Sequence, residues 1–232
     1  MFKRVLIKVS GEALGNDDGR GLNNEKLQKV ADQIVELSNQ NIECVVVIGA
    51  GNFWRGKYGY EYIERTTSDH MGMLATVLNG LALQACLEAK GKNVRMQTAV
   101  EMKEFAELYI RRKATRHLEK GRIVILGCGT GNPYFTTDTA AAQRALELDC
   151  DAILLAKNID GVYDKDPREF KEAKKYEELT YMQVINEGIK VMDTTAITLC
   201  MENNVPILVF ALNKENSLVR AVNGENLGTI IK

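Results

Sequence analysis

Gly127-Cys-Gly-Thr-Gly-Asn-Pro-Tyr-Phe-Thr-Thr-Asp-Thr139 is the stretch that decides the fold of this chain of 232 residues. It follows the apolar run Ile123-Val-Ile-Leu126 and leads into Ala140-Ala-Ala-Gln-Arg-Ala-Leu146. This order predicts a strand, then a loop rich in glycine and hydroxyl groups, then a helix. Glycine lets the backbone approach a phosphate closely, and the helix start supplies unpaired N–H groups. The stretch therefore predicts an anion site at a strand end.

Two upstream loops are built in the same way. Lys8-Val9-Ser10-Gly11-Glu12 follows the apolar run Val5-Leu6-Ile7, and Gly49-Ala50-Gly51-Asn52 follows Val45-Val46-Val47-Ile48. Three glycine-bearing turns at strand ends predict a site for several phosphates.

Helical and strand periods alternate along the whole chain. We expect strands at 3–9, 43–48, 94–98, 122–127, 152–156, 206–211 and 228–231. We expect helices from about Glu25 (capped by Asn23 or Asn24), from Asp69 to Lys90 with Asp69 as N-cap, and at 114–120, 138–148, 181–187, 193–203 and 216–222. Residues 99–112 fit an edge strand and a short helix equally well.

The strands at 45–48, 123–126, 153–155 and 207–210 are continuous apolar runs, the pattern of a sheet buried on both faces. Strands separated by helices pair in parallel, so we predict an α/β fold: a three-layer α/β/α sandwich with a mainly parallel central sheet. Ligands should bind outside the carboxyl ends of the strands. No linker separates the halves, so we expect one domain, 1–232, with lobes at about 1–150 and 151–232.

Composition narrows the function classes. Lys and Arg total 30 against 31 Asp and Glu, a net charge of −1, so a nucleic-acid partner is not expected. No apolar run approaches the roughly 20 residues that cross a bilayer, so no membrane partner is expected. There is no signal-peptide pattern, and the five cysteines are widely spaced without a metal-binding cluster. We expect a cytoplasmic protein with reduced thiols.

Two familiar phosphate-binding patterns are near-misses. Gly51-Asn-Phe-Trp-Arg-Gly56-Lys57 approaches the P-loop, but Tyr58 replaces the Ser or Thr that would bind Mg²⁺. The dinucleotide fingerprint fails because Asn132 stands where its third glycine belongs. A Rossmann-type NAD(P)-binding oxidoreductase stays as an alternative.

Five segments, in order along essentially the whole chain, resemble the bacterial uridylate (UMP) kinase family of the amino-acid kinase superfamily. They are Lys8-Val-Ser-Gly-Glu12, Asp69-His-Met-Gly-Met-Leu-Ala-Thr76, Gly129-Thr-Gly-Asn-Pro-Tyr-Phe-Thr-Thr-Asp138, Asp160-Gly-Val-Tyr163 with Asp166-Pro167, and Lys190-Val-Met-Asp193. The resemblance implies a nucleoside monophosphate kinase that moves the γ-phosphoryl group of ATP to UMP in pyrimidine nucleotide synthesis. ATP is then the donor, and Mg²⁺ is carried by ATP with no dedicated metal site in the protein.

The resemblance also implies roles for individual residues. Lys8, Arg55, Asp138 and Asp193 would be catalytic. Lys8, Val9, Ser10, Gly11, Gly51, Arg55, Asn158, Tyr163 and Asp166 would bind ATP. Ala50, Asp69, Thr130, Gly131, Asn132, Pro133, Tyr134, Phe135, Thr136 and Thr137 would bind UMP. Ala50 stands where the family generally has glycine, and a backbone N–H contact there is compatible with alanine if φ is negative.

Some of these residues have a simpler interpretation. Asp69, Asp138 and Asp193 lie near predicted helix starts and could be caps only. Asp138 and Asp193 could instead orient Lys8 or hydrated Mg²⁺.

The family further implies regulation and assembly. Asn16, Asp17, Asp18, Gly19, Arg20 and Gly21 correspond to a segment linked to activation by GTP, UTP is the expected inhibitor, and the expected assembly is a homohexamer. The same six residues could also be a plain turn. An acetylglutamate- or aspartate-type kinase of the same superfamily is a further alternative.

Overall fold

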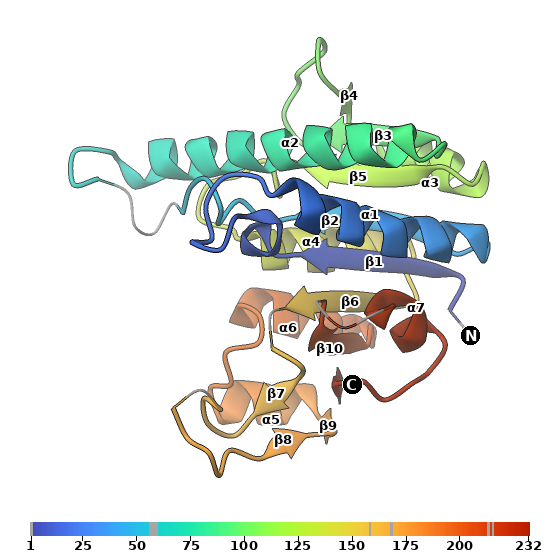
Figure 1. Ribbon diagram of the computed structural model, residues 1–232. Coiled ribbons are helices and arrows are strands. Elements are labelled where there is room, and N and C mark those ends of the chain that lie inside the picture. Colours follow the sequence, from blue (N-terminus) through green and yellow to red (C-terminus); the bar gives the residue numbers. More distant parts are fainter. Residues whose placement is uncertain (1, 56–59, 158, 168, 213, 215) are drawn as a thin grey trace.

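The computed structural model of the chain describes residues 2–55, 60–157, 159–167, 169–212, 214 and 216–232 (Figure 1). Over these residues the main sheet has nine strands in the order β4-β3-β5-β2-β1-β6-β10-β11-β9. Their bounds are β1 Arg4–Val9, β2 Glu43–Ile48, β3 Val94–Thr98, β4 Glu107–Leu108, β5 Ile123–Gly127, β6 Ala152–Lys157, β9 Glu178–Leu179, β10 Ile207–Ala211 and β11 Thr229–Ile231. A separate antiparallel pair joins β7 Val162–Tyr163 to β8 Lys175–Tyr176.

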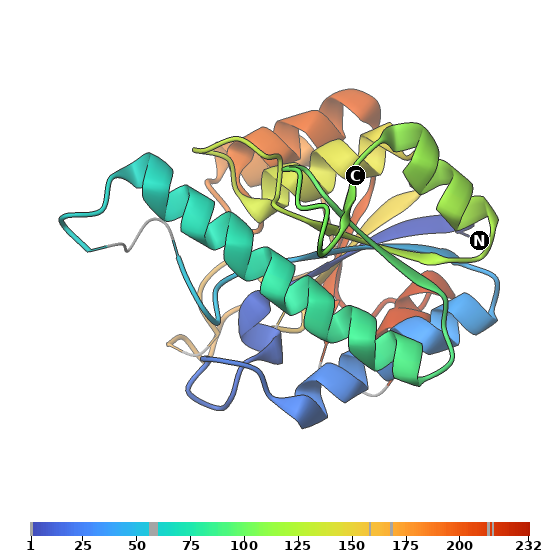
Figure 2. The ribbon, with the colours of Figure 1, turned by 90° about the horizontal axis from the view of Figure 1, so that it is seen from above.

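The pairing of the main sheet is parallel except between β10 and β11. Helices cover both faces, as Figure 2 shows. One face carries α1 Asn24–Asn39, α2 Arg65–Ala89 and α7 Ser217–Val222, and the other carries α3 Arg111–Glu119, α4 Thr137–Glu147, α5 Tyr181–Asn186 and α6 Thr194–Asn203. The prediction of a three-layer, mainly parallel α/β/α fold is confirmed.

Two hydrophobic cores lie on opposite faces of the sheet because side chains alternate along each strand. Val5, Ile7 and Leu154 pack into the core beneath α1 and α2, whereas Leu6 and Leu155 pack into the core beneath α4 and α6. All five are fully buried, and burying such a side chain contributes about 1.5–3 kcal/mol. The central strands are therefore a rigid base for the loops that follow them.

The start of α2 corrects one prediction. The helix begins at Arg65 with Glu64 at the N-cap, so Asp69 lies in its second turn and is not the cap. The first turn, Arg65-Thr-Thr-Ser68, is polar, and the apolar period that locates the helix in the sequence begins after it. Ser68 is buried, and its hydroxyl oxygen accepts a hydrogen bond from the Trp54 indole N–H (2.9 Å).

Of the two structures that fit residues 99–112, the edge strand is the one that forms, and the helix that follows it is the one predicted at 114–120. β4 pairs with the end of β3 through Gln97 opposite Glu107 and Thr98 opposite Leu108, and α3 then starts at Arg111. The two-residue strands β7, β8 and β9 and the 3₁₀ turn η1 (Gly11–Leu14) were not predicted. Elements this short hold too few residues to show a period.

The sequence analysis expects no membrane-spanning segment, because no uninterrupted apolar run is long enough. By length and average composition, however, α2 could cross a membrane, since the mean hydropathy of its most apolar window is 1.3. In the fold, α2 packs along β3, β5 and α1. Its inner face carries buried Thr76 and Asn79, which form hydrogen bonds with the loops after β5 and β2. The apolar residues of α2 thus belong to a helix that packs against the sheet.

Candidate functional site

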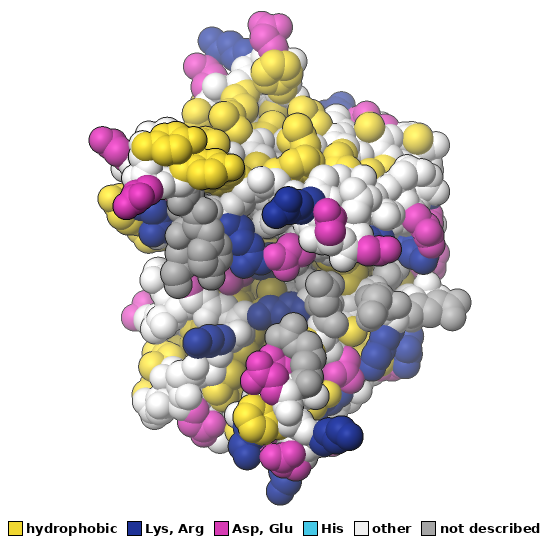
Figure 3. All heavy atoms as spheres, turned by 60° about the vertical axis from the view of Figure 1, so that its left-hand side comes forward, with side chains coloured by type: hydrophobic (Ala, Val, Ile, Leu, Met, Phe, Trp, Pro, Cys, Tyr) yellow, Lys and Arg dark blue, Asp and Glu magenta, His cyan; other side chains and the backbone are white. Residues whose placement is uncertain are grey.

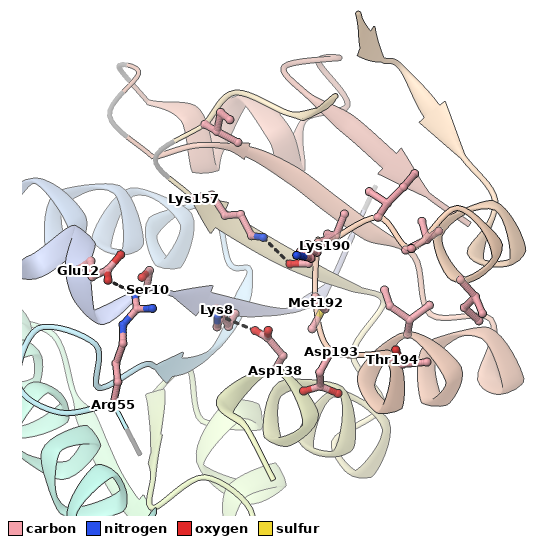
Figure 4. A pocket seen from close by; sticks show the side chains of 17 residues that line it. Lys8, Ser10, Glu12, Arg55, Asp138, Lys157, Lys190, Met192, Asp193 and Thr194 are labelled. Carbon is pink, nitrogen blue, oxygen red and sulfur yellow. Dashed lines mark hydrogen bonds and ion pairs between the residues drawn. The ribbon is translucent and has the colours of Figure 1, made fainter. Parts of the chain in front are cut away.

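Two cavities meet at the carboxyl ends of β1, β2, β5 and β6, where Lys8, Ser10 and Arg55 line both of them. The larger cavity, about 910 Å³, extends toward β6, α5 and α6 (Figure 4). The smaller cavity, about 420 Å³, extends toward α2 and the loop after β5. Figure 3, which looks toward this side, shows basic and acidic side chains gathered in the middle of the face. The structure thus brings the three sequence-predicted glycine loops together.

Lys8 and Asp138 form the centre of this region. Lys8 is the penultimate residue of β1, and its ammonium lies 2.6 Å from Oδ1 of Asp138, in the first turn of α4. The two side chains are 12% and 21% exposed. At this burial an ion pair is only partly screened by water, so Asp138 holds the ammonium at the junction of the two cavities.

Asp193 has a different position from Asp138. It is the N-cap of α6, where Oδ1 accepts a hydrogen bond from the N–H of Ala196 (2.8 Å). Its Oδ2 accepts hydrogen bonds from the hydroxyls of Thr139 (2.8 Å) and Thr136, which is itself the N-cap of α4. Asp193 therefore joins the starts of α4 and α6, and Asp138 is the carboxylate that orients Lys8.

The loops after β1 and β2 approach each other so closely that only glycine fits at position 11. A Cβ on Gly11 would lie 2.5 Å from both Asn52 Oδ1 and the carbonyl oxygen of Gly49. Ala50 is not among the described residues with positive φ, so alanine is accommodated there without backbone strain. This geometry directs the loop backbones into the smaller cavity, which Gly11, Gly49, Ala50 and Gly51 all line.

A buried amide pair fixes the same loops. Asn52 and Asn79 exchange side-chain hydrogen bonds of 2.9 and 2.8 Å, and Asn79 also donates to the carbonyl of Gly49 (2.8 Å). Asn52 donates further to the carbonyl of Gly21 (2.7 Å). The sequence analysis did not identify this pair because its members lie 27 residues apart and, although Asn52 belongs to a predicted glycine loop, nothing in the sequence indicates Asn79 as its partner.

Arg55 forms an ion pair with Glu12, and both line the larger cavity (Figure 4). Their side chains are about half exposed, so this pair can open to let the guanidinium meet another anion. The next residues of the P-loop near-match, Gly56, Lys57 and Tyr58, lie outside the described residues.

Asp69 lines the smaller cavity from the second turn of α2. Its carboxylate accepts hydrogen bonds from Nε of Arg65 (2.9 Å) and from the backbone N–H of Tyr134 (2.8 Å). The Arg65 guanidinium in turn lies over the Tyr134 ring, 5.3 Å from its centroid. Asp69 therefore connects α2 to the loop after β5, a role that its predicted position as a helix cap did not suggest.

The loop after β5 divides into residues that face the smaller cavity and residues that do not. Thr130, Asn132, Phe135, Thr136 and Thr137 line it. Among the described lining residues, Gly131, Pro133 and Tyr134 are absent: Gly131 (φ +81°) packs against Ala99, and Tyr134 is exposed.

Cys128 begins this loop, and its backbone N–H donates a hydrogen bond to the hydroxyl of Thr76 (2.8 Å). Burial raises the pKa of the Cys128 thiol above its usual value. A protonated, buried thiol is a poor nucleophile, so this cysteine is structural.

On the β6 side, Asn158 lies outside the described residues. The Tyr163 hydroxyl donates a hydrogen bond to Asp160 (2.7 Å), and this bond, with the nearby Lys214 and Lys175, lowers the pKa of Asp160. Asp166 starts a turn in which its carbonyl accepts from the N–H groups of residues 169 and 170. Tyr163 and Asp166 do not appear among the described residues lining the larger cavity.

The Val9 side chain is fully buried in the core, and its carbonyl accepts the N–H of Gly49 (2.9 Å).

A third cavity, about 860 Å³, lies beside the predicted effector segment, of which Asn16, Asp17, Asp18 and Gly19 line it. Glu12 lines both this cavity and the larger one. Arg20 and Gly21 are not among the described residues that line it, and the N–H of Gly21 donates to the carbonyl of Asn52 (3.0 Å).

Lys157, the last residue of β6, lines the larger cavity and was not predicted as a site residue. The signal in the sequence is an apolar strand that ends on a lysine, whereas β1 carries Lys8 one residue before its end. The described part of the chain holds no group of three or more His, Cys, Asp or Glu side chains that could bind a metal ion.

Known proteins resemble this chain over most or all of its length. A model of the amino acid kinase family matches residues 3–211. The chain is similar to the crystal structure of UMP kinase from Bacillus anthracis, with 41% identity, a TM-score of 0.96, and coverage of 100% of this chain and 96% of that one. It is also similar to UMP kinase from Ureaplasma parvum (37% identity, TM-score 0.94, coverage 100% and 99%) and to uridylate kinase from Archaeoglobus fulgidus (27%, 0.75, 98% and 99%).

Proposed function

Since the chain belongs to the amino acid kinase family, we propose that it is a UMP kinase, which transfers the γ-phosphoryl group of ATP reversibly to UMP and yields ADP and UDP. One observation carries the proposal. The two cavities share Lys8, Ser10 and Arg55, so phosphates entering from either side meet at the same cations.

In the proposed reaction, a phosphate oxygen of UMP forms a bond to the γ-phosphorus while the bond from that phosphorus to the bridging oxygen breaks and ADP leaves. Such a transfer needs alignment and charge neutralisation more than a general base, because the acceptor phosphate is already ionised near neutral pH. Lys8, held by Asp138, faces the transferring group. The ion pair between Arg55 and Glu12 opens, and the Arg55 guanidinium then pairs with a phosphate. Asp193 keeps the starts of α4 and α6 in place.

Mg²⁺ would enter as part of the donor nucleotide, coordinated by its phosphates and neutralising their charge. The protein groups fit this arrangement. Both oxygens of Asp193 already accept hydrogen bonds, and Oδ1 of Asp138 is paired with Lys8. Asp138 is therefore the carboxylate that could contact the hydration shell of the ion.

The smaller cavity would hold UMP. Asp69 would accept hydrogen bonds from the ribose hydroxyls, while Thr130 and Asn132 face the pyrimidine and Thr136 and Thr137 present the start of α4 to the phosphate. Phe135 and the Ala50 backbone complete the lining, and Gly131, Pro133 and Tyr134 shape the loop from behind.

The larger cavity would hold ATP. Ser10, which lines both cavities, and Gly11 and Gly51, which line the smaller one, would offer backbone N–H groups to its phosphates where the two cavities meet, with Val9 fixing the loop. We place the adenosine near Asn158, Tyr163 and Asp166. This divides the domain 1–232 into an acceptor lobe of about 1–150 and a donor lobe of about 151–232.

We further propose that the third cavity binds a regulatory nucleotide, GTP as activator with UTP as inhibitor. Glu12 would couple this cavity to the reaction centre, because it lines both and pairs with Arg55. The location would be cytoplasmic, where the product feeds UTP and CTP synthesis.

For assembly, we propose a homohexamer that uses the outer face of α2. Leu74 and Leu78 are 56% and 47% exposed, and Val100 and Phe105 expose further apolar surface; Figure 3 shows hydrophobic side chains gathered on the upper part of the molecule. Such a surface favours association. Leu74→Glu with Leu78→Glu should lower the mass measured by light scattering, whereas Met182→Glu, equally exposed on α5, should not. An unchanged mass would contradict this interface.

The function is tested by ADP release in the presence of UMP, CMP, AMP, GMP, acetylglutamate and aspartate. We expect UMP to be used at least about 100-fold better than the others, since an unpaired polar group in a site costs two or more orders of magnitude. Preference for an amino acid would instead support the acetylglutamate- or aspartate-type alternative, and binding of NADH in place of ATP would support the oxidoreductase.

A further inference from the structure

β1 carries Lys8 next to its carboxyl end, and β6 ends on Lys157. They are adjacent parallel strands with Lys8 opposite Leu155, so Lys157 lies two residues beyond the partner of Lys8. Since side chains alternate, Leu6, Lys8, Leu155 and Lys157 all project from one face of the sheet. With strands about 4.8 Å apart and a rise of about 3.3 Å per residue, the Cα atoms of the two lysines are roughly 8 Å apart. Two neighbouring buried strands thus each present a lysine at their carboxyl end.

The Lys157 side chain points into the larger cavity, as Figure 4 shows. Its ammonium donates a hydrogen bond to the backbone carbonyl of Val191, in the segment that leads to Asp193. An ammonium carries three N–H donors, so this contact leaves two for another acceptor.

The electrostatic setting of Lys157 favours an anion in that place. Burial lowers the pKa of its ammonium, the charge of Lys8 lowers it further, and Asp138 partly compensates. A neutral carbonyl offsets little of the cost of burying a charge, whereas a phosphate oxygen offsets much more. The described ion pairs of the cavity already join Lys8 to Asp138 and Arg55 to Glu12.

We propose that Lys157 is a further catalytic cation of this site, binding the phosphates of the donor nucleotide from the side opposite Arg55. Lys8 lines both cavities, but Lys157 lines only the larger one. Lys157 therefore contacts the β-phosphate and the bridging oxygen, where negative charge develops as ADP leaves, and Lys8 contacts the transferring group. This inference rests on the proposed phosphoryl transfer.

A purely structural role makes a different prediction. If Lys157 only tied β6 to Val191, its loss would disturb every ligand of the larger cavity equally. If it binds phosphates, its loss should weaken ADP and leave adenosine, which has no phosphate, unchanged. The comparison of these two ligands separates the roles.

The test uses Lys157→Met, which keeps the length of the side chain and removes its charge. The control is Lys92→Met, in the turn after α2, where the Lys92 ammonium donates a hydrogen bond to the side chain of Asn39 (2.6 Å) and lines none of the three cavities described above. Calorimetry should show ADP affinity falling about ten- to hundredfold in Lys157→Met, with adenosine affinity within twofold of wild type. With UMP and ATP, kcat should fall about 100-fold. Lys92→Met should match the wild type in all of these.

Equal weakening of ADP and adenosine, or unchanged ADP affinity, would overturn the proposal. A wild-type chain that binds ADP but does not phosphorylate UMP would refute the proposed function, and the ADP–adenosine comparison would still decide the role of Lys157.

A measurement on the wild-type chain covers the case in which Lys157→Met does not fold. Reductive methylation followed by peptide mass spectrometry should show ADP slowing the modification of Lys157 at least tenfold, while adenosine does not and Lys92 is modified at a constant rate. Modification of Lys157 at the same rate with and without ADP would overturn the proposal.

Discussion

The smaller and larger cavities meet at Lys8, but different kinds of groups line them. The smaller cavity is shaped by backbone: glycine loops in close contact, a buried amide pair between Asn52 and Asn79, and a loop that Asp69 holds against α2. The larger cavity combines charged side chains, among them Lys8 and Lys157 from β1 and β6, with an apolar wall from α5 and the segment that leads to α6. A backbone-built pocket suits recognition of one acceptor, whereas a cluster of cations suits charge that moves during transfer. Substitutions on the two sides should therefore fail in different ways.

The largest effect is expected at the shared centre. Lys8→Met removes one of the two cations that line both cavities, the one paired with Asp138, so kcat should fall about 1,000-fold while the affinities for both nucleotides change much less. Steady-state kinetics combined with calorimetry would measure both, and a thermal melt would verify folding. A kcat within tenfold of wild type would remove Lys8 from the mechanism.

A substitution in the glycine loops of the smaller cavity should lower the stability of the folded protein. Gly11→Ala places a Cβ 2.5 Å from the Gly49 carbonyl oxygen, so the loops must separate, at a cost of about 1–3 kcal/mol in the free energy of unfolding. Urea denaturation would measure this cost. Gly72→Ala is the matched control: it lies within α2 with its nearest neighbour 3.9 Å away, and it should be neutral or stabilising by up to about 1 kcal/mol. Equal behaviour of the two variants would contradict the close approach.

A smaller and more selective effect is expected at Asp69. Asp69→Asn keeps the shape of the side chain and removes its charge, so the KM for UMP should rise about ten- to hundredfold with a KM for ATP within about threefold of wild type. Initial rates with each substrate varied in turn would show the split. If both constants rose together, Asp69 would be assigned to holding the Tyr134 loop alone.

The smallest effect is expected from the cysteines. Burial raises the pKa of Cys44, Cys150 and Cys200 to about 12, and it also raises those of Cys128 and Cys86. A raised thiol pKa means that less thiolate is present at pH 8, and labelling should accelerate as the pH increases. Iodoacetamide at pH 8 should therefore react first with the partly exposed Cys86 and leave turnover unchanged. Loss of turnover together with alkylation of Cys128 would show a functional thiol in the acceptor loop.

The parts of this molecule that were predictable are those with a local signal. The apolar runs of β2, β5 and β6 are uninterrupted because both faces of each strand are buried, and glycine loops follow β2 and β5 directly. The missed features depend on contacts between distant segments. Asn79 finds Asn52 only after α2 has packed on the sheet, and Lys157 reads as an ordinary strand-end lysine until the register of β1 and β6 places it beside Lys8. The start of α2 was misplaced because its first turn is polar and its cap, Glu64, forms no side-chain cap hydrogen bond.

The central claim, that donor and acceptor phosphates meet at Lys8, is tested most directly by a bisubstrate analogue in which the 5′ ends of uridine and adenosine are joined by five phosphates. Calorimetry should show one molecule bound per chain, at least about 100-fold more tightly than ATP, because linked ligands gain from a high effective concentration. Either UMP or ATP alone should displace it, and Lys8→Met should weaken it. Binding no tighter than that of ATP, without competition from UMP, would contradict the account.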